Sequence, residues 1–310
     1  MEYRRLGSSG LKVSEVGLGS NNFGWRLDEQ SSIRVIEHAL DVGINFIDTA
    51  DVYGRGQSEE FIGKAVKSKR AQVLLATKFG NPMGAGPNER GGSRHYIMQA
   101  VEASLKRLQT DYIDLYQMHI WDSTTPIEET LRALDDLVRA GKVRYIGCSN
   151  YAAWQLCEAL WTSDVNNLES FVTVQPQYNL LNRSIEQELV PCCQAYGVGV
   201  IPFSPLASGF LTGKYRRGQE APAGTRLASN PMMQSRVLTD RNFDQLAKLE
   251  AFAVQRGHGM GELAIAWLLS HPWLSTVIAG ATNAEQVSAN VAAGEWKLTA
   301  EEAAAVNQIA

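Results

Sequence analysis

Short apolar runs rich in β-branched residues alternate with amphipathic segments along almost the whole chain. This alternation is typical of repeated βα units, which build a parallel sheet. Eight runs fit the strand pattern, and eight is the strand number of a closed α/β barrel. The predicted strands are Val16–Ser20, Ile44–Asp48, Val73–Lys78, Ile113–His119, Val143–Ser149, Phe171–Gln175, Gly199–Phe203 and Thr276–Gly280.

Amphipathic segments between these runs predict the helices that would surround the barrel. Four of them are followed by a glycine, the residue that most often ends a helix. These glycines are Gly43, Gly141, Gly197 and Gly257. The predicted helices are Glu29–Val42, Ser58–Lys69, Ser93–Arg107, Ile127–Ala140, Ala152–Leu160, Ile185–Tyr196 and Asp240–Arg256.

Two regions lie outside the alternation. Tyr3–Leu6 and Leu11–Ser14 flank the sequence GSSG, which predicts an amino-terminal β-hairpin. The segment Ser204–Thr239, after the seventh predicted strand, is rich in Gly, Pro, Ser and Arg. A loop of this length inside a domain is usually functional or mobile.

Length and composition fit one domain over residues 1–310, because an α/β barrel needs roughly 250 residues. A net charge of −4 without a long basic run predicts neither a nucleic-acid nor a membrane partner. No apolar stretch approaches the length of a signal peptide or membrane span, so we expect a soluble cytoplasmic protein. The four cysteines lack metal-ligand spacing and are expected to be reduced, with a redox switch at Cys192–Cys193 as the alternative.

Three predicted strands end at a polar residue. These residues are Asp48 in INFIDTA, Lys78 in VLLATKFG and His119 in IDLYQMHI, and Tyr53 follows Asp48 by five residues. In a parallel barrel the carboxyl ends of the strands meet at one mouth, where such folds keep their chemistry. We therefore expect these four side chains to share one cleft.

This combination suits proton donation to a carbonyl oxygen. A free tyrosine has a pKa of about 10, and a nearby ammonium group lowers it. Tyr53 is thus the candidate general acid, Lys78 its tuner and Asp48 the anchor of Lys78. His119 would orient the carbonyl from the other side. No side chain delivers a hydride, which predicts a bound nicotinamide as the reductant.

Each of the four residues also has an ordinary structural interpretation. Asp48 is compatible with a turn or a helix cap, and His119 with a hydrogen-bonded core residue. Tyr53 is compatible with a packing aromatic, and Lys78 with a charge that extends from a strand end to solvent. The order and location of all four residues together favour the catalytic interpretation.

Several segments of the chain resemble the aldo-keto reductase superfamily. They are INFIDTADVYGRGQSEEFIGKAV, LLATKFG, SLKRLQTDYIDLYQMH, KVRYIGCSN, VQPQYNLLNR and FSPLASGFLTGKY. The resemblance runs from Tyr3 to about Leu298 and points to the branch with bacterial stress-type reductases and β subunits of voltage-gated potassium channels. It implies a (β/α)8 TIM barrel, with the hairpin at its floor, that reduces aldehydes and ketones with NADPH. It also implies that Asp48, Tyr53, Lys78 and His119 are the catalytic tetrad.

A nicotinamide partner raises the question of its binding site. Gly17-Leu18-Gly19 is no Rossmann fingerprint, because Asn22 takes the third glycine position and no helix opens there. Barrels hold phosphates in the loops after strands seven and eight, here FSPLASGFLTGKY and AGATNAEQ. By resemblance, Phe203 stacks on the nicotinamide, and its carboxamide bonds to Ser149, Asn150 and Gln175. The resemblance places Ser204, Leu206, Ser208 and Lys214 around the pyrophosphate, and Gln286 and Asn290 on the adenine side, although the last two also fit a solvated helix face.

The sequence departs from many family members where they bind the 2′-phosphate of NADPH. Their Lys, Ser and later Arg correspond here to Gly280, Ala281 and Gln286. The channel-β-like branch uses a Ser near Thr282 and an Arg in the long loop, and Arg226 in GTRLAS matches the latter. This favours NADPH as the cofactor and leaves NADH open.

The substrate is only loosely defined by the sequence. Four aromatic residues lie in or near loops at the predicted mouth and would form an apolar pocket for a small carbonyl compound, although aromatics at these positions also fit the core. They are Phe23, Trp25, Phe79 and Trp121. The physiological substrate, the direction of the reaction and the choice between monomer and homo-oligomer stay open.

Two other function classes also stay open at this point. A regulatory subunit resembling the channel β proteins would bind NADPH and turn over slowly. A metal-dependent hydrolase would need clustered ligands, and the remaining histidines fall on helices or loops away from strand ends, so no metal is expected. These histidines are His38, His95, His258 and His271.

Overall fold

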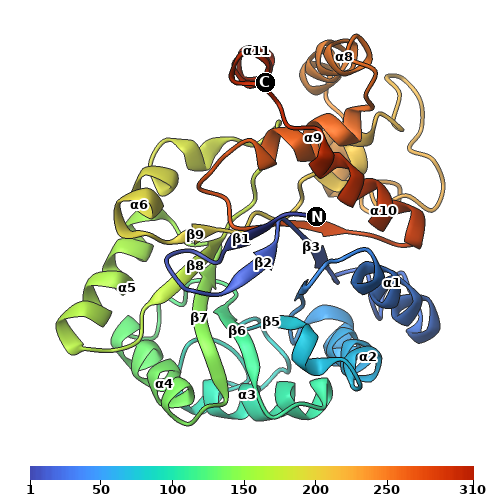
Figure 1. Cartoon of the computed structure of the whole chain (residues 1–310). Coiled ribbons are helices and arrows are strands. Elements are labelled where there is room, and N and C mark those ends of the chain that lie inside the picture. Colours follow the sequence, from blue (N-terminus) through green and yellow to red (C-terminus); the bar gives the residue numbers. More distant parts are fainter.

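Eight parallel strands form the centre of the computed structural model, which describes residues 1–310. Their order in the sheet is β10-β3-β4-β5-β6-β7-β8-β9, and helices surround them (Figure 1). This arrangement confirms the predicted (β/α)8 barrel. The strands are β3 (Val16–Gly19), β4 (Phe46–Asp48), β5 (Leu74–Phe79), β6 (Ile113–Met118), β7 (Val143–Ser149), β8 (Phe171–Gln175), β9 (Gly199–Val200) and β10 (Val277–Gly280).

Isolated bridges close the barrel between β9 and β10, the strands at the two ends of the sheet order. Val200 pairs with Leu274 and Phe203 pairs with Ile278, both in parallel orientation. β9 is shorter than the predicted Gly199–Phe203 because Pro202 has no N–H to donate to the ladder. The carbonyl oxygen of Pro202 still accepts a hydrogen bond of 2.9 Å from the backbone N–H of Ile278. The strand therefore ends early, while the pairing that closes the barrel continues.

Most helices lie close to their predicted positions. They are α1 (Glu29–Asp41), α2 (Gln57–Val66), α3 (Arg94–Leu108), α4 (Ile127–Arg139), α5 (Ala153–Asn166), α6 (Leu189–Tyr196) and α8 (Asp240–Val254). α10 (Ala284–Ala292) is the helix that carries Gln286 and Asn290, which were expected on one helix face. The predicted helix Ile185–Tyr196 is divided, because a 3-10 turn at Ser184–Glu186 precedes α6. The glycines that follow α1, α4, α6 and α8 all have positive φ, as expected of helix ends.

Three helices were not predicted from the sequence. They are α7 (Pro231–Val237) in the long segment, α9 (Met260–Leu269) and α11 (Ala300–Ile309). In α9 eight of the ten residues are buried, so the helix has no polar face to mark its period. None of the helices combines the length and the apolar character needed to cross a membrane.

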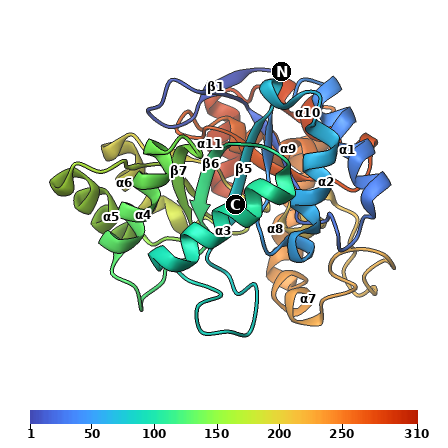
Figure 2. The same ribbon diagram turned by 90° about the horizontal axis from the view of Figure 1, so that it is seen from below.

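The predicted amino-terminal hairpin covers one end of the barrel. Its strands are β1 (Tyr3–Arg5) and β2 (Lys12–Ser14). Leu6 and Val13 are fully buried among barrel side chains that include Phe46 and Leu115. Gly7 has φ +59°, and a Cβ there would lie 2.2 Å from the carbonyl oxygen of Val172. In Figure 2 the hairpin and α7 lie at opposite ends of the molecule, which leaves the carboxyl ends of the strands free for a site.

Candidate active site

The parallel strands bring the four predicted polar residues together at one mouth. Asp48 is the last residue of β4, Lys78 is the penultimate residue of β5, and His119 directly follows β6. Tyr53 begins a short 3-10 turn, Tyr53–Gly56, that leads into α2. The ammonium of Lys78 lies 5.1 Å from the centre of the Tyr53 ring, and the rings of Tyr53 and His119 are 5.8 Å apart. The four side chains therefore lie close together, with Asp48 and Tyr53 at the pocket surface and Lys78 fully buried behind them.

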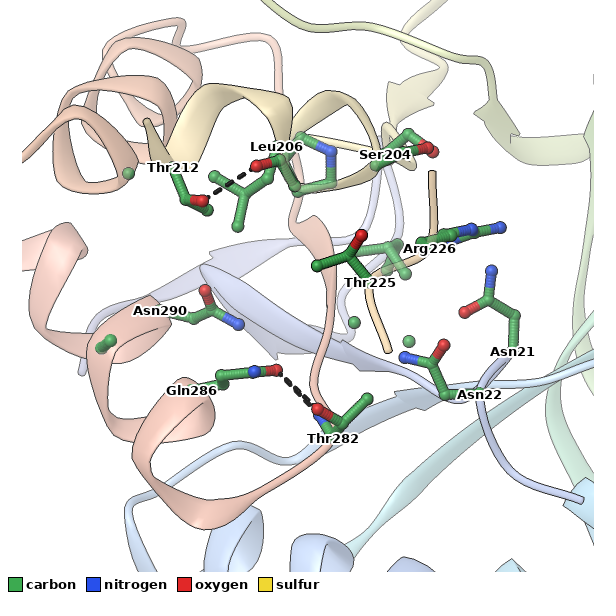
Figure 3. Close-up of a pocket in the computed structure, with 18 of the residues that line it drawn as sticks. Asn21, Asn22, Ser204, Leu206, Thr212, Thr225, Arg226, Thr282, Gln286 and Asn290 are labelled. Carbon is green, nitrogen blue, oxygen red and sulfur yellow. Dashed lines mark hydrogen bonds between the residues drawn. The ribbon is translucent and has the colours of Figure 1, made fainter. Parts of the chain in front are cut away.

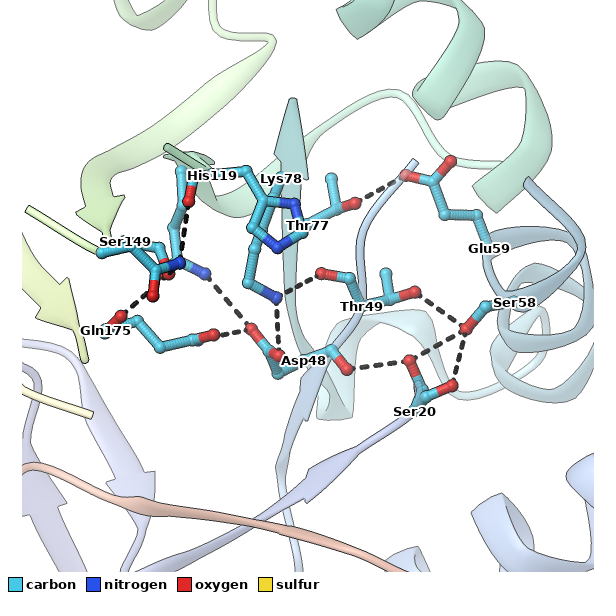
Figure 4. Close-up of polar contacts among 12 residues, drawn as sticks. Ser20, Asp48, Thr49, Ser58, Glu59, Thr77, Lys78, His119, Ser149 and Gln175 are labelled. Atoms are coloured by element: carbon cyan, nitrogen blue, oxygen red, sulfur yellow. Dashed lines mark hydrogen bonds and ion pairs between the residues drawn. The ribbon is translucent and has the colours of Figure 1, made fainter. Parts of the chain in front are cut away.

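Asp48 is the centre of a buried hydrogen-bond network (Figure 4). Its Oδ2 accepts a bond of 2.7 Å from Lys78 Nζ, which also donates to the carbonyl oxygen of Thr49 at 2.7 Å. Its Oδ1 accepts bonds of 2.8 Å from Gln175 Nε2 and 3.2 Å from Gln117 Nε2. Both carboxylate oxygens are thus satisfied, as a buried charge requires.

Three residues expected to bind the nicotinamide carboxamide form a layer around this network. Gln175 directs its amide nitrogen at Asp48. The hydroxyl of Ser149 donates to the backbone carbonyl of Gln175 at 2.8 Å, and Asn150 Nδ2 donates to the backbone carbonyl of His119 at 3.0 Å. In this structure the side-chain amide of Gln175 bonds to Asp48, and that of Asn150 bonds to the backbone of His119. A nicotinamide carboxamide would have to bond to atoms of these residues that make no such contact.

Burial and neighbouring charges act together on the pKa values of Lys78 and His119. Burial opposes a charge on Lys78, but Asp48 and Tyr53 raise the pKa of the lysine overall. Burial lowers the pKa of His119 to about 3, with repulsion from Lys78 acting in the same direction. The imidazole is therefore neutral, and its Nδ1 is buried without a partner.

The expected tuning of Tyr53 is only partly present. Lys78 lowers the pKa of the phenol as predicted, yet burial is the larger effect and raises the pKa above its ordinary value. The prediction considered the ammonium alone and omitted desolvation of the phenolate. At neutral pH Tyr53 is consequently protonated and able to donate.

The turn that carries Tyr53 has an unusual backbone. Gly54, Arg55 and Gly56 all have positive φ, of 56°, 55° and 95°. A Cβ at Gly54 would lie 2.9 Å from the Cα of Gly24, so only glycine allows these two loops to touch. Left-handed conformations at residues other than glycine persist only where the surroundings enforce them. Neighbouring loops therefore fix the place of the phenol.

A large pocket opens beside Tyr53 and Asp48, with a volume of about 910 Å³ (Figure 3). Its walls come from the loops after β3, β9 and β10, from the amino-terminal end of α9 and from α10. Ten predicted cofactor residues line it, namely Phe203, Ser204, Leu206, Ser208, Lys214, Arg226, Gly280, Thr282, Gln286 and Asn290. Ser149, Asn150 and Gln175 do not line it, although Asn150 is exposed and the other two are buried.

Several residues of the site were missed by the sequence analysis. Gln117 lies two residues before His119, so it faces the same side of the strand, and this spacing was the available signal. Asn21, Asn22 and Arg26 line the pocket from the loop after β3. Arg26 donates a hydrogen bond to the carbonyl oxygen of Gly224 and so joins this loop to the long segment. The sequence offers no signal for that contact, because the two segments are nearly two hundred residues apart.

Three cations lie at the pocket without a carboxylate partner. They are Arg26, Lys214 and Arg226, and none takes part in an ion pair of the protein. Burial, and repulsion from Arg26, lower the pKa of both Lys214 and Arg226. Unpaired cations in a concave surface attract anionic ligands. The pocket is therefore suited to a ligand with several negative charges.

Arg226 and Thr282 lie on different sides of this pocket. The guanidinium of Arg226 is 6.0 Å from the centre of the Trp25 ring. In Figure 3 it lies near Asn21, whereas Thr282 bonds to Gln286 on the other side, with an N···O distance of 2.9 Å. Both residues line the pocket, from the long segment and from the loop after β10.

The predicted aromatic substrate pocket needs correction. Phe23 and Phe79 are both 0% exposed and belong to the main hydrophobic core, so they offer no surface to a ligand. Trp25 is 56% exposed, and Trp121 is half-buried with its ring edge-on to Tyr151. An aromatic residue next to a strand end can point into the hydrophobic core or toward the pocket. The sequence alone does not distinguish these two orientations.

A comparison with protein families agrees with this geometry. The model of the aldo/keto reductase family matches residues 15–310. The chain belongs to this family. The match covers all eight strands of the barrel, the four residues at its mouth and the walls of the pocket.

Relatives of the chain carry names of reductases and of potassium channel subunits. It is 40% identical to the uncharacterized oxidoreductase YrpG of Bacillus subtilis (strain 168) over 100% of this chain and 96% of that protein. It is 39% identical to a probable voltage-gated potassium channel subunit beta of Oryza sativa subsp. japonica, over 94% and 91% of the two chains. Versiconal hemiacetal acetate reductase of Aspergillus parasiticus is 38% identical, over 97% and 95%. These names fit the branch suggested by the sequence.

The buried pair of Lys78 and Asp48 leads to a prediction about stability. Lys78→Met should lower the free energy of unfolding by about 3–5 kcal/mol, because it leaves the Asp48 carboxylate buried without its cation. Adding Asp48→Asn to this variant should recover part of the loss. Urea unfolding of both single variants and the double variant measures the coupling.

An exposed ion pair supplies the control. Lys64→Met removes the partner of Glu29 on the surface and should cost less than about 1 kcal/mol. Strictly additive effects of Lys78→Met and Asp48→Asn would show that the buried pair is not coupled and would contradict the prediction.

Proposed function

We propose that this aldo/keto reductase reduces aldehyde or ketone groups to alcohols, reversibly, with NADPH as the preferred reductant. One observation carries the proposal. A protonated tyrosine, a buried lysine–aspartate pair and a neutral histidine converge at the rim of a pocket whose three cations lack partners. The tyrosine, the lysine–aspartate pair and the histidine suit protonation of a carbonyl oxygen. The pocket suits a cofactor with several negative charges.

The residues at the mouth have distinct roles in this proposal. Tyr53 donates its proton to the carbonyl oxygen of the substrate, and Lys78 stabilises the phenolate that remains. Asp48 keeps Lys78 charged and aimed through the bond of 2.7 Å between them. His119, being neutral, presents an N–H that orients the carbonyl and stabilises its developing charge.

The pocket fits a nicotinamide dinucleotide by the chemistry of its donors. When bound, a reduced nicotinamide supplies the hydride that no side chain provides. Phe203 would contact its ring, and the loop with Ser204, Leu206 and Ser208 would hold the pyrophosphate together with Lys214. Ser204 and Ser208 have positive φ, of 56° and 59°, a backbone form that turns N–H groups toward a bound anion. Gln286 and Asn290 would line the adenine end.

The substrate in this proposal is a small carbonyl compound. Trp25 and Trp121 are the two predicted aromatic residues with surface to offer at the mouth. Aromatic walls favour apolar or aromatic groups next to the carbonyl. Turnover measured on a panel of aldehydes, ketones and alcohols with NADPH and NADH tests the proposal and defines the substrate class. Tight NADPH binding with negligible turnover on every compound would instead favour a regulatory subunit resembling the channel β proteins.

The role of Tyr53 leads to the first catalytic prediction. Tyr53→Phe should reduce carbonyl turnover by at least roughly a hundredfold, because the general acid is lost while the packing of the ring remains. NADPH affinity, measured by fluorescence titration, should stay nearly unchanged. Turnover near that of the wild type would exclude Tyr53 as the proton donor.

The preference for NADPH rests on Arg226 in this proposal. A guanidinium forms paired, charge-assisted hydrogen bonds to a 2′-phosphate, which NADH lacks. Arg226→Ala should therefore weaken NADPH binding by roughly tenfold to more than a hundredfold, equivalent to about 1.5–3 kcal/mol, and leave NADH binding nearly unchanged.

Arg236 provides a matched control, since it belongs to α7 of the same long segment but does not line the pocket. Arg236→Ala should leave both affinities unchanged. An equal loss of NADPH and NADH affinity in Arg226→Ala would place the guanidinium at the pyrophosphate, and no loss would remove it from the site.

A further inference from the structure

A second group of polar side chains, buried except for the half-buried Arg107, lies behind the turn that carries Tyr53, and the proposed chemistry does not use it. These residues come from the loop after β4 and from α2, α3 and β6. Two are carboxyl groups, two are tyrosine hydroxyls and one is a guanidinium. They are Asp51, Glu59, Tyr96, Tyr116 and Arg107.

Arg107, the only cation of this group, forms an ion pair with Glu59. Glu59 is 0% exposed and accepts bonds of 2.6 Å from Arg107 Nε and 2.6 Å from Thr77 Oγ1. Asp51 is 1% exposed and has no ion-pair partner, and its Oδ1 has no hydrogen-bond partner. An ionised carboxylate in that position would be buried without compensation.

The hydroxyl of Tyr96 lies between two oxygen atoms that can each accept its single proton. It lies 3.3 Å from the carbonyl oxygen of Asn81 and 3.4 Å from Asp51 Oδ2. A hydroxyl has one proton, and a carbonyl oxygen can only accept. If Tyr96 donates to Asn81, then its oxygen is left to accept a proton from Asp51. Burial, and then the charge of Glu59, raise the pKa of Asp51 to about 7, so at neutral pH a large share of the molecules carries the proton and below it most do.

Asp51 is directly connected to two residues of the proposed active site. It precedes Tyr53 by two positions, and its backbone N–H donates to the carbonyl oxygen of Lys78 at 3.1 Å. The same turn rests on the polar group at Gly56, where a Cβ would lie 2.7 Å from Cδ of Arg107. A shift of the Asp51 carboxyl group would therefore move the turn and its phenol.

We propose that Asp51 is a positioning residue that, as a neutral acid, donates its proton to Tyr96 and thereby holds the Tyr53 turn in its reactive position. Loss of that proton releases the turn and lowers turnover.

The inference rests on the proposed carbonyl reduction. The groups that face Asp51 are Glu59 of α2, Tyr96 and Arg107 of α3, and Tyr116 of β6. Burial and the charge of Glu59 oppose ionisation of Asp51 more strongly than the backbone N–H of Val52, Arg107 and the hydroxyl of Tyr96 favour it. Arg107 is itself paired with Glu59.

The first test measures the proton itself, independently of activity. The folded protein binds the Asp51 proton more tightly than the unfolded chain, in which the pKa is about 4. Its stabilising effect is therefore complete below about pH 4 and is lost as the pH rises toward 7. Between these values the Tm of the wild type should fall relative to that of Asp51→Asn, whose amide stays neutral. Parallel Tm curves would overturn the inference, whether or not the protein reduces carbonyls.

The second test measures turnover against pH. The kcat of the wild type should fall above neutral pH, by up to roughly tenfold for each pH unit, and Asp51→Asn should lack this fall. The pKa of Tyr53 is raised above its ordinary value of 10.0, so its own ionisation lies well apart. KM for NADPH should not follow the fall in kcat. Identical pH profiles for the two proteins would overturn the inference.

Asp114→Asn is the control variant. It removes a buried carboxylate that pairs with Arg70 at the other end of β6, and its kcat should still fall above neutral pH.

Tyr96→Phe is a second test. It removes the acceptor of the Asp51 proton, so the pH at which kcat falls should become lower. A move to higher pH would mean that Tyr96 donates to an ionised Asp51, which contradicts the inference even if Asp51→Asn does not fold. Absence of carbonyl reduction in every protein would refute the proposed function, while the Tm curves would still decide the state of Asp51.

Discussion

The buried ion pair of Lys78 and Asp48 is the interaction on which the site depends. Neither charge is tolerable there alone, and the pair is stable only because Gln117, Gln175 and the carbonyl of Thr49 satisfy the remaining positions. The strands of the barrel supply these groups from neighbouring carboxyl ends. The pair in turn places a positive charge 5.1 Å from the ring of Tyr53. The fold thus positions the ammonium group of Lys78, whose charge is central to the proposed chemistry.

Much of this arrangement could be predicted because it follows from local patterns. Runs such as those before Asp48, Lys78 and His119 predict strands, and parallel strands bring their carboxyl ends together whatever the details of packing. The glycines after helices, such as Gly43 and Gly197, predicted helix ends for a similar local reason. The hairpin at the amino terminus was also predictable from its turn. Family resemblance then extended the prediction to pocket residues such as Phe203 and Gln286.

What could not be predicted depends on three-dimensional surroundings. α9 is buried on all sides, so its sequence shows no helical period. Phe23 and Phe79 lie next to the mouth but point into the core. The contact between Arg26 and the carbonyl of Gly224 joins distant loops. The pKa of Tyr53 is set mainly by burial, which residue spacing does not reveal.

Hydride transfer to a carbonyl carbon is the central claim of the proposed function. It can be measured by incubating the protein with an aldehyde and NADPH that carries deuterium at the transferable position of nicotinamide C4. The account predicts an alcohol with one deuterium on the carbinol carbon and an equal amount of oxidised cofactor. An alcohol without deuterium, or cofactor that is bound but never oxidised by any carbonyl compound, would contradict it.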